Sequence, residues 1–353
     1  MKAILYGSFL VTTLMLTGCE PSSRGYKYNE GTFPETPLNL GVINSPDDDY
    51  NSTVPTYGEV LPLIFSSKRG GRTDFDFVKE SFNYRFDRTT GTFSVDNRPY
   101  GGLDILQEQA PLAGALSAAN SAGNELGPYV RSYDRELIRD GFLTHYAEYL
   151  MLFASDRSGH LDIYLTHNYQ TPPASNTATV NCNTNKPFKA PVAIPGLNSS
   201  ADDAYPTFNK TFDEIYFTSN RGGTFDIYKA KLPAIPPTEL HSRLPELTDL
   251  AIEKVTALSG TADDKCPYID KDILVFTSNR PGGLGGFDLY YSRFEKGSWS
   301  EPVNFGPSVN SAYDEYRPVL RETEGYRQRL LLFSSNRPGG KGGFDLYLVG
   351  VLK

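Results

Sequence analysis

Residues 277–292 read TSNRPGGLGGFDLYYS, and the same pattern returns four more times along the chain. The other copies are IFSSKRGGRTDFDFV from Ile64, LFASDRSGHLDIYLT from Leu152, YFTSNRGGTFDIYKA from Tyr216 and LFSSNRPGGKGGFDLYLV from Leu332. Each copy has an apolar run that reaches Ser, then Arg, a Gly-rich turn, and Asp at the start of a second β-rich run. A strand, a glycine turn and a strand form a hairpin, so the sequence predicts one hairpin repeated five times.

The spacing of the copies indicates how large each repeat is. Successive motif arginines are 88, 64, 59 and 57 residues apart, from Arg69 to Arg337. Each interval is long enough for a four-stranded unit with its loops, which is typical of a β-propeller blade. The 353 residues, 32 glycines and 25 prolines fit many short strands with turns. We therefore predict an all-β chain with five four-stranded blades, and six blades as the alternative.

The N-terminus has the features of an exported, lipid-modified protein. Lys2 precedes an apolar run from Ala3 to Leu16, and Leu-Thr-Gly stands directly before Cys19. Residues 1–18 resemble a bacterial lipoprotein signal peptide, and Cys19 would then carry the lipid that holds the protein on a membrane. Residues 19–36 are polar and Gly/Pro-rich and are predicted to be a flexible tether. A single propeller domain is expected over 37–353.

A second repeated element precedes each hairpin and contains Asn-Ser or Ser-Gly, a pair of acidic or amide residues, and a proline. Its acids are Asp49, Glu125, Asp203, Asp264 and Glu315. Together with the hairpins this pattern resembles the TolB-type, or WD40-like, propeller repeat of bacterial envelope proteins. The resemblance covers about Pro37 to Lys353 and implies a propeller in the cell envelope. Because the chain ends without a fourth strand for its last blade, PLNLG at 37–41 is expected to close the ring, which removes exposed sheet edges.

Three sets of charged residues should each form a ring around the propeller. They are the five acids above, the motif arginines Arg69, Arg157, Arg221, Arg280 and Arg337, and the hairpin aspartates Asp76, Asp162, Asp226, Asp288 and Asp345. One interpretation is a charged ring that binds a ligand or a cation. The other, which we favour, is that each arginine is held between the acid before its blade and the aspartate of its hairpin. A residue needed once for catalysis would not be required five times.

Signals for catalysis or cofactors are weak. The four histidines, at 145, 160, 167 and 241, show no metal-ligand spacing, and no Gly-x-Ser-x-Gly motif occurs. No cofactor is therefore predicted. A net charge of −8 disfavours a nucleic-acid partner. Cys182 and Cys266 are expected on opposite faces, too far apart for a disulfide, so both are predicted to be free and Cys266 to be buried.

The non-repeated links between third and fourth strands, roughly 79–110, 168–187 and 232–251, are either a binding surface or tolerated surface insertions. These links should emerge on the face opposite the Ser-Asn-Arg loops, where long loops on a rigid scaffold can bind a partner. The main expectation is a non-enzymatic, outer-membrane lipoprotein that binds an envelope protein or a glycan. The alternative is a glycan-active enzyme, since five-bladed propellers host glycosidases. Two or three non-repeated carboxylates at the channel mouth would favour the enzyme.

Overall fold

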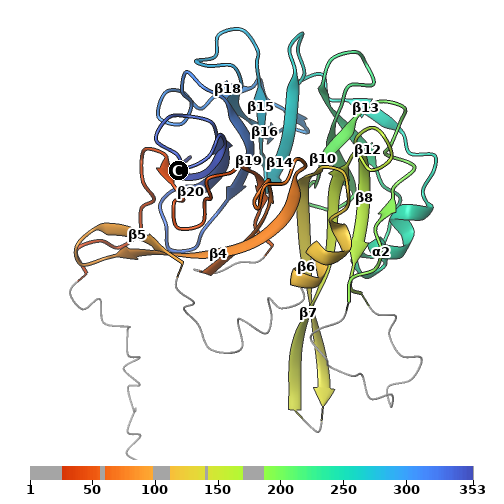
Figure 1. The fold of residues 1–353 in the computed structure, drawn as a ribbon, viewed down its shortest axis with the longest axis horizontal. Helices are drawn as coiled ribbons and strands as arrows, with labels where there is room; N and C mark the ends of the chain where they lie inside the picture. Colours follow the sequence, from red (N-terminus) through yellow and green to blue (C-terminus); the bar gives the residue numbers. More distant parts are fainter. Residues whose placement is uncertain (1–25, 56–59, 98–111, 140–141, 170–186, 353) are drawn as a thin grey trace, which may run out of the picture.

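The computed structural model describes residues 26–55, 60–97, 112–139, 142–169 and 187–352, and omits the side chains of 60 and 134–147. Its strands form five antiparallel sheets in chain order. The first strand of each sheet contacts the first strand of the next, around a closed ring. Figure 1 shows four of these inner strands, β6, β10, β14 and β19, gathered near the centre of the molecule. The prediction of a five-bladed β-propeller is confirmed.

Each blade starts with its inner strand. Blade one holds β2 (Asp49–Thr53), β3 (Val60–Ser67), β4 (Asp76–Asp87) and β5 (Thr92–Asp96). Blade two holds β6 (Glu125–Arg139), β7 (Phe142–Ser155), β8 (Asp162–His167) and β9 (Val192–Ala193). Blade three holds β10 (Asp203–Phe208), β11 (Glu214–Ser219), β12 (Asp226–Lys231) and β13 (Ile252–Lys254). Blade four holds β14 (Asp264–Asp270), β15 (Ile273–Ser278), β16 (Asp288–Glu295), β17 (Ser298–Trp299) and β18 (Val303–Asn304); blade five holds β19 (Glu315–Arg321), β20 (Arg329–Ser335) and β21 (Asp345–Val351).

The ring closes through the N-terminal strand β1 (Leu38–Asn39). This strand pairs antiparallel with β21, with Leu38 opposite Leu348 and Asn39 opposite Tyr347. The last blade thus takes its fourth strand from the other end of the chain, as the sequence predicted.

Every inner strand contains the same irregularity. The register between inner and second strand shifts just after the second residue of each inner strand. The residue at the shift has a positive φ in all five blades, at Asn51, Gly127, Tyr205, Cys266 and Arg317. In four blades the next residue is the repeated proline, which is tolerated inside a sheet at a bulge. The prolines therefore mark a bulge within each of these strands, rather than its first residue.

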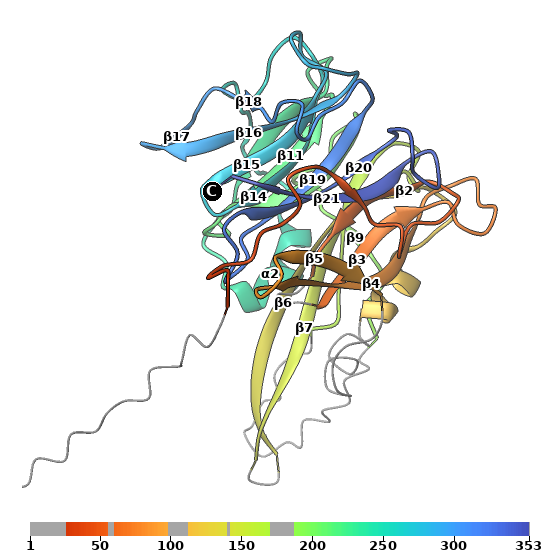
Figure 2. The same cartoon turned by 90° about the vertical axis from the view of Figure 1, so that its left-hand side faces the viewer.

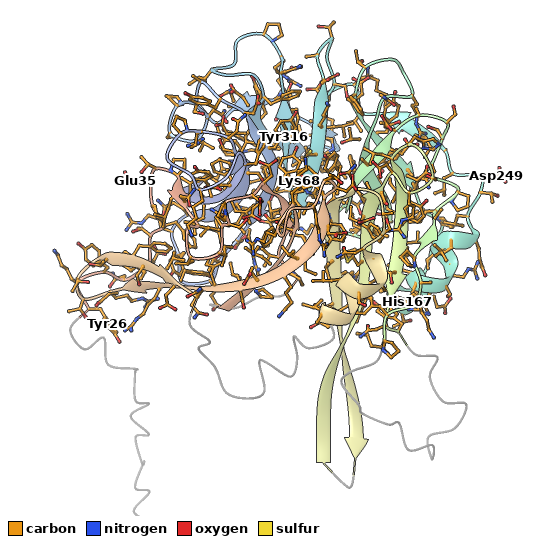
Figure 3. The ribbon with its side chains drawn as sticks, in the orientation of Figure 1. Tyr26, Glu35, Lys68, His167, Asp249 and Tyr316 are labelled. Carbon is orange, nitrogen blue, oxygen red and sulfur yellow. The ribbon has the colours of Figure 1, made fainter. Side chains whose placement is uncertain are left out.

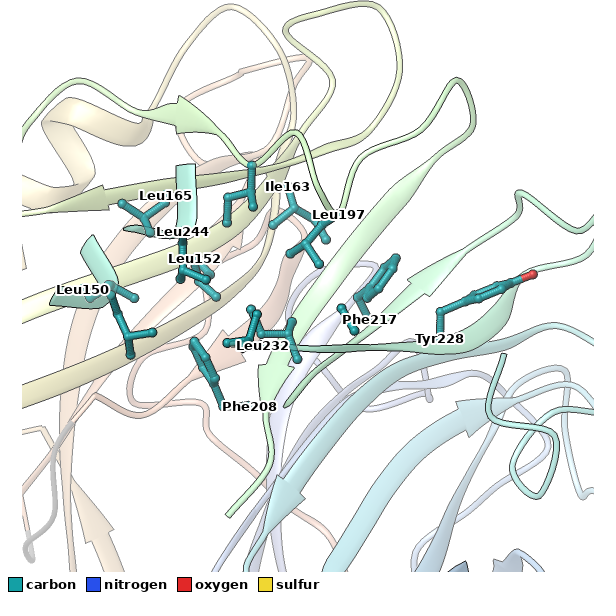
Figure 4. Packing of buried hydrophobic residues seen from close by; sticks show 14 of the residues in the cluster. Leu150, Leu152, Ile163, Leu165, Leu197, Phe208, Phe217, Tyr228, Leu232 and Leu244 are labelled. Atoms are coloured by element: carbon teal, nitrogen blue, oxygen red, sulfur yellow. The ribbon is translucent and has the colours of Figure 1, made fainter. Parts of the chain in front are cut away.

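Apolar side chains fill the spaces between adjacent blades. Between blades two and three, Leu150, Leu152 and Leu165 pack with Phe208 and Phe217, all at most 2% exposed (Figure 4). Alternation along strands places one side of each sheet against the preceding blade and the other against the following blade. Such two-sided burial makes each blade depend on its neighbours, so we expect the ring to unfold as one unit.

Several segments depart from the regular blade. β6 and β7 pair along Glu125–Arg139 and Phe142–Ser155, and their hairpin projects well beyond the ring (Figure 2). In blade one, β5 pairs with the far end of β4. A helix over residues 112–119 packs against Phe77 near the start of β4. The 232–251 link contains η1 (Pro237–Glu239), α2 (Leu240–Arg243) and η2 (Leu244–Glu246). No helix within the described ranges is long and apolar enough to cross a membrane.

The structure also corrects the boundary of the predicted tether. Residues 26–36 were expected to be flexible, yet Phe33 is only 2% exposed and stacks on Tyr326 with ring centroids 4.3 Å apart. The Phe33 amide donates to Gln328 at 3.2 Å, and Gly350 donates to the Pro34 carbonyl at 2.8 Å. Burial of this aromatic ring against blade five holds the segment on the propeller. The predicted signal peptide and Cys19 lie outside the described residues.

Candidate functional site

The motif arginines lie where the sequence placed them, each against the acid at the start of its own inner strand. Arg280 Nη2 is 2.6 Å from Asp264 Oδ1, and Arg221 Nη2 is 2.6 Å from Asp203 Oδ1. Arg69, Arg157 and Arg337 make the equivalent contacts, at 3.0, 3.0 and 2.8 Å, to Asp49, Glu125 and Glu315. All five acids are fully buried. We call the side of the ring that carries these pairs the arginine face.

The second half of the predicted clamp is wrong, because the hairpin aspartates bind elsewhere. Asp288 accepts hydrogen bonds from the Leu284 and Gly285 amides at 2.6 and 3.1 Å and from Asn304 at 2.8 Å. The equivalents in the other blades bind turn or outer-strand groups: Asp345 binds Lys341 and Asn39, Asp162 binds Ser158, Asp226 binds Thr224 and Lys254, and Asp76 binds Arg72. The aspartate begins the third strand, beside the outer strand, whereas the arginine extends inward to the first strand.

Near the middle of the ring the channel is filled. Arg317 is fully buried, and its guanidinium donates to the carbonyls of Pro128 at 2.9 Å and Pro267 at 3.3 Å. It therefore bridges blades two, four and five. Tyr205 enters the same region beside Gly127, where a Cβ would lie 2.4 Å from the tyrosine ring. Glycine in blade two thus makes room for the tyrosine of blade three.

At the opposite end of the inner strands lies an open cavity of about 830 Å³, which we call the mouth cavity. All five blades contribute to its lining, which includes the following residues: Tyr84, Tyr129, Phe208, Phe212, Tyr268, Asp270, Lys271, Arg321, Glu322, Glu324 and Tyr326. β14 begins at Asp264 on the arginine face and ends at Asp270 in this cavity. The cavity therefore opens on the other side of the ring, here called the loop face.

Two carboxylates of the mouth cavity, Asp270 and Glu322, lie close to the guanidinium of Arg329. Arg329 Nη1 is 2.6 Å from Asp270 Oδ2, and Arg329 Nη2 is 3.6 Å from Glu322 Oε2. Lys271 Nζ lies 2.6 Å from the same Glu322 oxygen. Burial raises the pKa of the Asp270 carboxyl above its usual value, although Arg329 opposes the shift. The hydrogen bond from Lys271 lowers the pKa of Glu322. The two carboxyls thus differ in their affinity for a proton.

Aromatic rings form the apolar walls of the cavity and hold one another in place. Tyr129 and Phe208 have ring centroids 5.7 Å apart, and Phe208 and Phe212 lie 5.6 Å apart. On the other side Tyr84 and Tyr326 meet edge to face at 5.6 Å. Such paired rings are stable platforms. A cavity with aromatic walls and a few converging polar groups is the usual form of a small-molecule site.

The remaining sequence predictions have separate outcomes. Cys266 is free and fully buried, and burial raises the pKa of its thiol to about 12; Cys182 lies outside the described residues. Within the described residues, no group of three His, Cys, Asp or Glu side chains is arranged to hold a metal ion. His167 and His241 have ring centroids 4.5 Å apart, and burial lowers the pKa of His167 to about 4. Figure 3 shows His167 toward the projecting hairpin, away from Lys68 on the arginine face.

The mouth cavity opens on the loop face, where the sequence placed the long links between third and fourth strands, but inner-strand turns form most of its lining. Its lining comes mainly from the turns between first and second strands, at 208–212, 268–271 and 321–326. Among the described residues of the predicted links, only 79–110 contributes, through Tyr84, and this part of it is the end of strand β4. These turns lie next to the axis because the inner strands do. A signal was available in the sequence, since Asp270 ends one inner strand and Glu322 and Glu324 come shortly after another, and none of the three belongs to the repeat.

Comparison with known proteins finds no sequence match and several distant structural likenesses. The sequence matches no family model and no curated protein sequence. Among solved structures, an alpha-L-arabinofuranosidase from Podospora anserina is 10% identical, with 92% of this chain and 98% of that chain covered at a TM-score of 0.45. The GH62 alpha-L-arabinofuranosidase catalytic domain of Coprinopsis cinerea is 11% identical, with coverage of 92% and 98% and a TM-score of 0.43. A putative TolB from Agrobacterium tumefaciens is 12% identical, with coverage of 92% and 99% and a TM-score of 0.38.

These structures correct one expectation. We predicted a non-enzymatic scaffold, with a glycan-active enzyme as the alternative. Glycoside hydrolases stand beside TolB among the structural neighbours, so the expectation that the chain is not an enzyme is withdrawn. The likeness concerns the fold alone, so it identifies neither a reaction nor a substrate. The function must be argued from the residues of the mouth cavity.

Proposed function

We propose that this propeller binds a carbohydrate chain in the mouth cavity and hydrolyses it with Asp270 and Glu322. The observation that carries the proposal is a cavity of about 830 Å³ with aromatic walls and two carboxyls whose pKa values shift in opposite directions. Sugars present both apolar ring faces and hydroxyl groups. Aromatic side chains can cover the former, and charged side chains can hydrogen-bond the latter.

The two carboxyls suit the two roles of glycoside hydrolysis. One must keep a proton for the leaving oxygen, and the other must remain ionised as base or nucleophile. Asp270 is the better proton donor, because burial raises its pKa. Glu322 is the better anion, because Lys271 stabilises its charged form. Environments that separate the pKa values of two nearby carboxyls are a recognised basis for assigning acid and base. Arg329 contacts both groups and fixes their relative position.

The test measures release of reducing sugar from a panel of polysaccharides by the wild type and by Asp270→Asn and Glu322→Gln. We expect each substitution to lower kcat by about a hundredfold or more, while binding persists. Asp272→Asn is the matched control. Asp272 lies 3.8 Å from the same Arg329 guanidinium but is not part of the cavity lining. The Asp272→Asn variant should therefore be as active as the wild type. Equal activity in all four proteins would exclude the two carboxyls as catalysts, and failure to bind any glycan would exclude the site.

We also propose that the protein is held on the bacterial outer membrane by lipid on Cys19. Support comes from the lipobox-like Leu-Thr-Gly before Cys19 and the apolar run preceding it. An envelope location would place the mouth cavity among glycans and envelope proteins as partners. Metabolic labelling with a fatty-acid analogue should mark the wild type and leave Cys19→Ala unlabelled. A labelled Cys19→Ala protein would contradict the anchor and leave the mouth-cavity proposal untouched.

A further inference from the structure

A second, smaller cavity of about 270 Å³ adjoins the mouth cavity. The two share Tyr129, Phe212, Tyr268, Asp270 and Arg321, and all five blades also line the second cavity. Its volume lies below the roughly 300–1,000 Å³ usual for drug-sized ligands. It therefore fits a single sugar ring rather than a longer segment.

Arg131 of β6 enters this second cavity between two aromatic rings. Its guanidinium carbon lies 3.3 Å from the Phe212 ring centroid and 4.2 Å from that of Tyr133. Stacking on both sides fixes the plane of the guanidinium before any ligand arrives, which lowers the ordering cost of binding. Arg131 Nη1 is buried, and no described group accepts a hydrogen bond from it.

The charge of Arg131 also lacks a counter-ion among the side chains that the structure describes. Every motif arginine is paired with a buried acid. Asp270, the carboxylate that lines both cavities, already forms a salt bridge with Arg329, with 2.6 Å between Oδ2 and Nη1. Burial lowers the pKa of Arg131, and no described carboxylate opposes that shift. In a chain of net charge −8, a partly buried and unpaired arginine is unexpected, because desolvating an unpaired charge is costly.

We propose that the second cavity is a subsite for an acidic sugar, a uronate, whose carboxylate pairs with Arg131. This inference rests on the proposed glycan-binding function and narrows its substrate class. The planar guanidinium matches a carboxylate with two parallel hydrogen bonds. A phosphate would fit the same fork, but it carries a second negative charge. The charged residues that line the cavity are Arg131, Arg321 and Asp270, which carry a net charge of +1, so a singly charged carboxylate balances them and a doubly charged phosphate does not.

The experiment compares binding of a hexuronate trisaccharide with binding of its carboxyl-reduced, neutral counterpart and of a sulfated trisaccharide. The wild type should bind the uronate about tenfold or more tightly than the neutral sugar, as expected for a charge-assisted pair. Arg131→Met should bind uronate and neutral sugar equally, and Arg131→Lys should keep part of the preference. Arg131→Met should also retain its urea midpoint, whereas loss of a purely structural arginine would lower it.

The outcomes separate this inference from the proposed function. Equal binding of uronate and neutral sugar by the wild type would overturn the uronate subsite while leaving glycan binding in place. Tighter binding of the sulfated sugar would overturn the assignment of a carboxylate. Absence of binding to all three sugars, together with no hydrolysis in the polysaccharide panel, would overturn both.

Discussion

Replacement of Arg280 by methionine tests whether the arginine ring is structural. Arg280 Nη2 lies 2.6 Å from Asp264 and 2.7 Å from the Leu258 carbonyl, and Nε lies 2.9 Å from Ser278 Oγ. Its guanidinium carbon is also 5.0 Å from the ring of Tyr290. Methionine keeps the apolar stem beside this ring but removes the charge and every donor.

The expected cost follows from what the substitution leaves behind. Asp264 is fully buried and would keep the hydrogen bond that it accepts from the Gly260 amide at 2.9 Å. Removing one partner of a buried ion pair typically costs about 3–5 kcal/mol. Because the Arg280 side chain is 21% exposed, water can partly solvate the site, so we expect about 3 kcal/mol, the lower end of that range.

Urea unfolding of four proteins measures this cost. The wild type and Arg280→Met are compared with the double variant Arg280→Met/Asp264→Asn, which removes the stranded charge and should recover at least half of the loss. Arg243→Met is the exposed control, because Arg243 and Glu246 form a surface pair at 3.5 Å, and its loss should cost about 0.5 kcal/mol or less. An Arg280→Met protein with unchanged stability and impaired ligand binding would refute the structural role.

Two further predictions concern burial. Cys266 should resist alkylation at pH 8 in the native protein and react only in urea, because its thiol is fully buried with its pKa raised to about 12. Because the pKa of this thiol is higher in the folded than in the unfolded state, its contribution to the free energy of unfolding is complete below the unfolded pKa of about 8.5 and is lost as pH rises toward 12. In Cys266→Ala the free energy of unfolding should therefore fall less between these pH values than it does in the wild type. Phe33→Ala should destabilise the propeller by about 3 kcal/mol in urea unfolding, because this ring is 2% exposed and stacked on Tyr326; an unchanged midpoint would mean that residues 26–36 are a tether after all.

The fold could be predicted from the sequence because each blade repeats the same hairpin motif. The five copies of Ser-x-Arg and a glycine turn fixed the number of hairpins, and PLNLG supplied the missing strand β1. Of the two acids expected to hold each arginine, only the one at the start of the inner strand does so. Asp264 and Asp288 are both acids of blade four near Arg280 in sequence, yet only Asp264 is bonded to it. Sequence spacing alone does not show which strand of its blade a long side chain will reach.

The packed segment before the propeller and the long β6–β7 hairpin were not predicted. Polar residues and glycines surround Phe33, so its local sequence resembles a tether, and only the surface offered by Tyr326 and Gln328 changes the outcome. The hairpin over Glu125–Arg139 and Phe142–Ser155 begins with an ordinary inner strand. Its extra length appears in the sequence only as a wider interval between Arg69 and Arg157, which loops could equally have filled.

The two ends of the inner strands are under different constraints, and this difference explains where a site could develop. At the arginine face every inner strand starts with a buried acid, because an acid there completes the contact that each blade repeats. At the loop face the same strands end in Phe208, Asp270 and Arg321, which share no type. Residues there converge on the axis from five blades, yet none is needed for the repeat. A five-fold scaffold can therefore carry an asymmetric cavity, to which all five blades contribute aromatic rings whereas its acidic lining residues come from blades four and five.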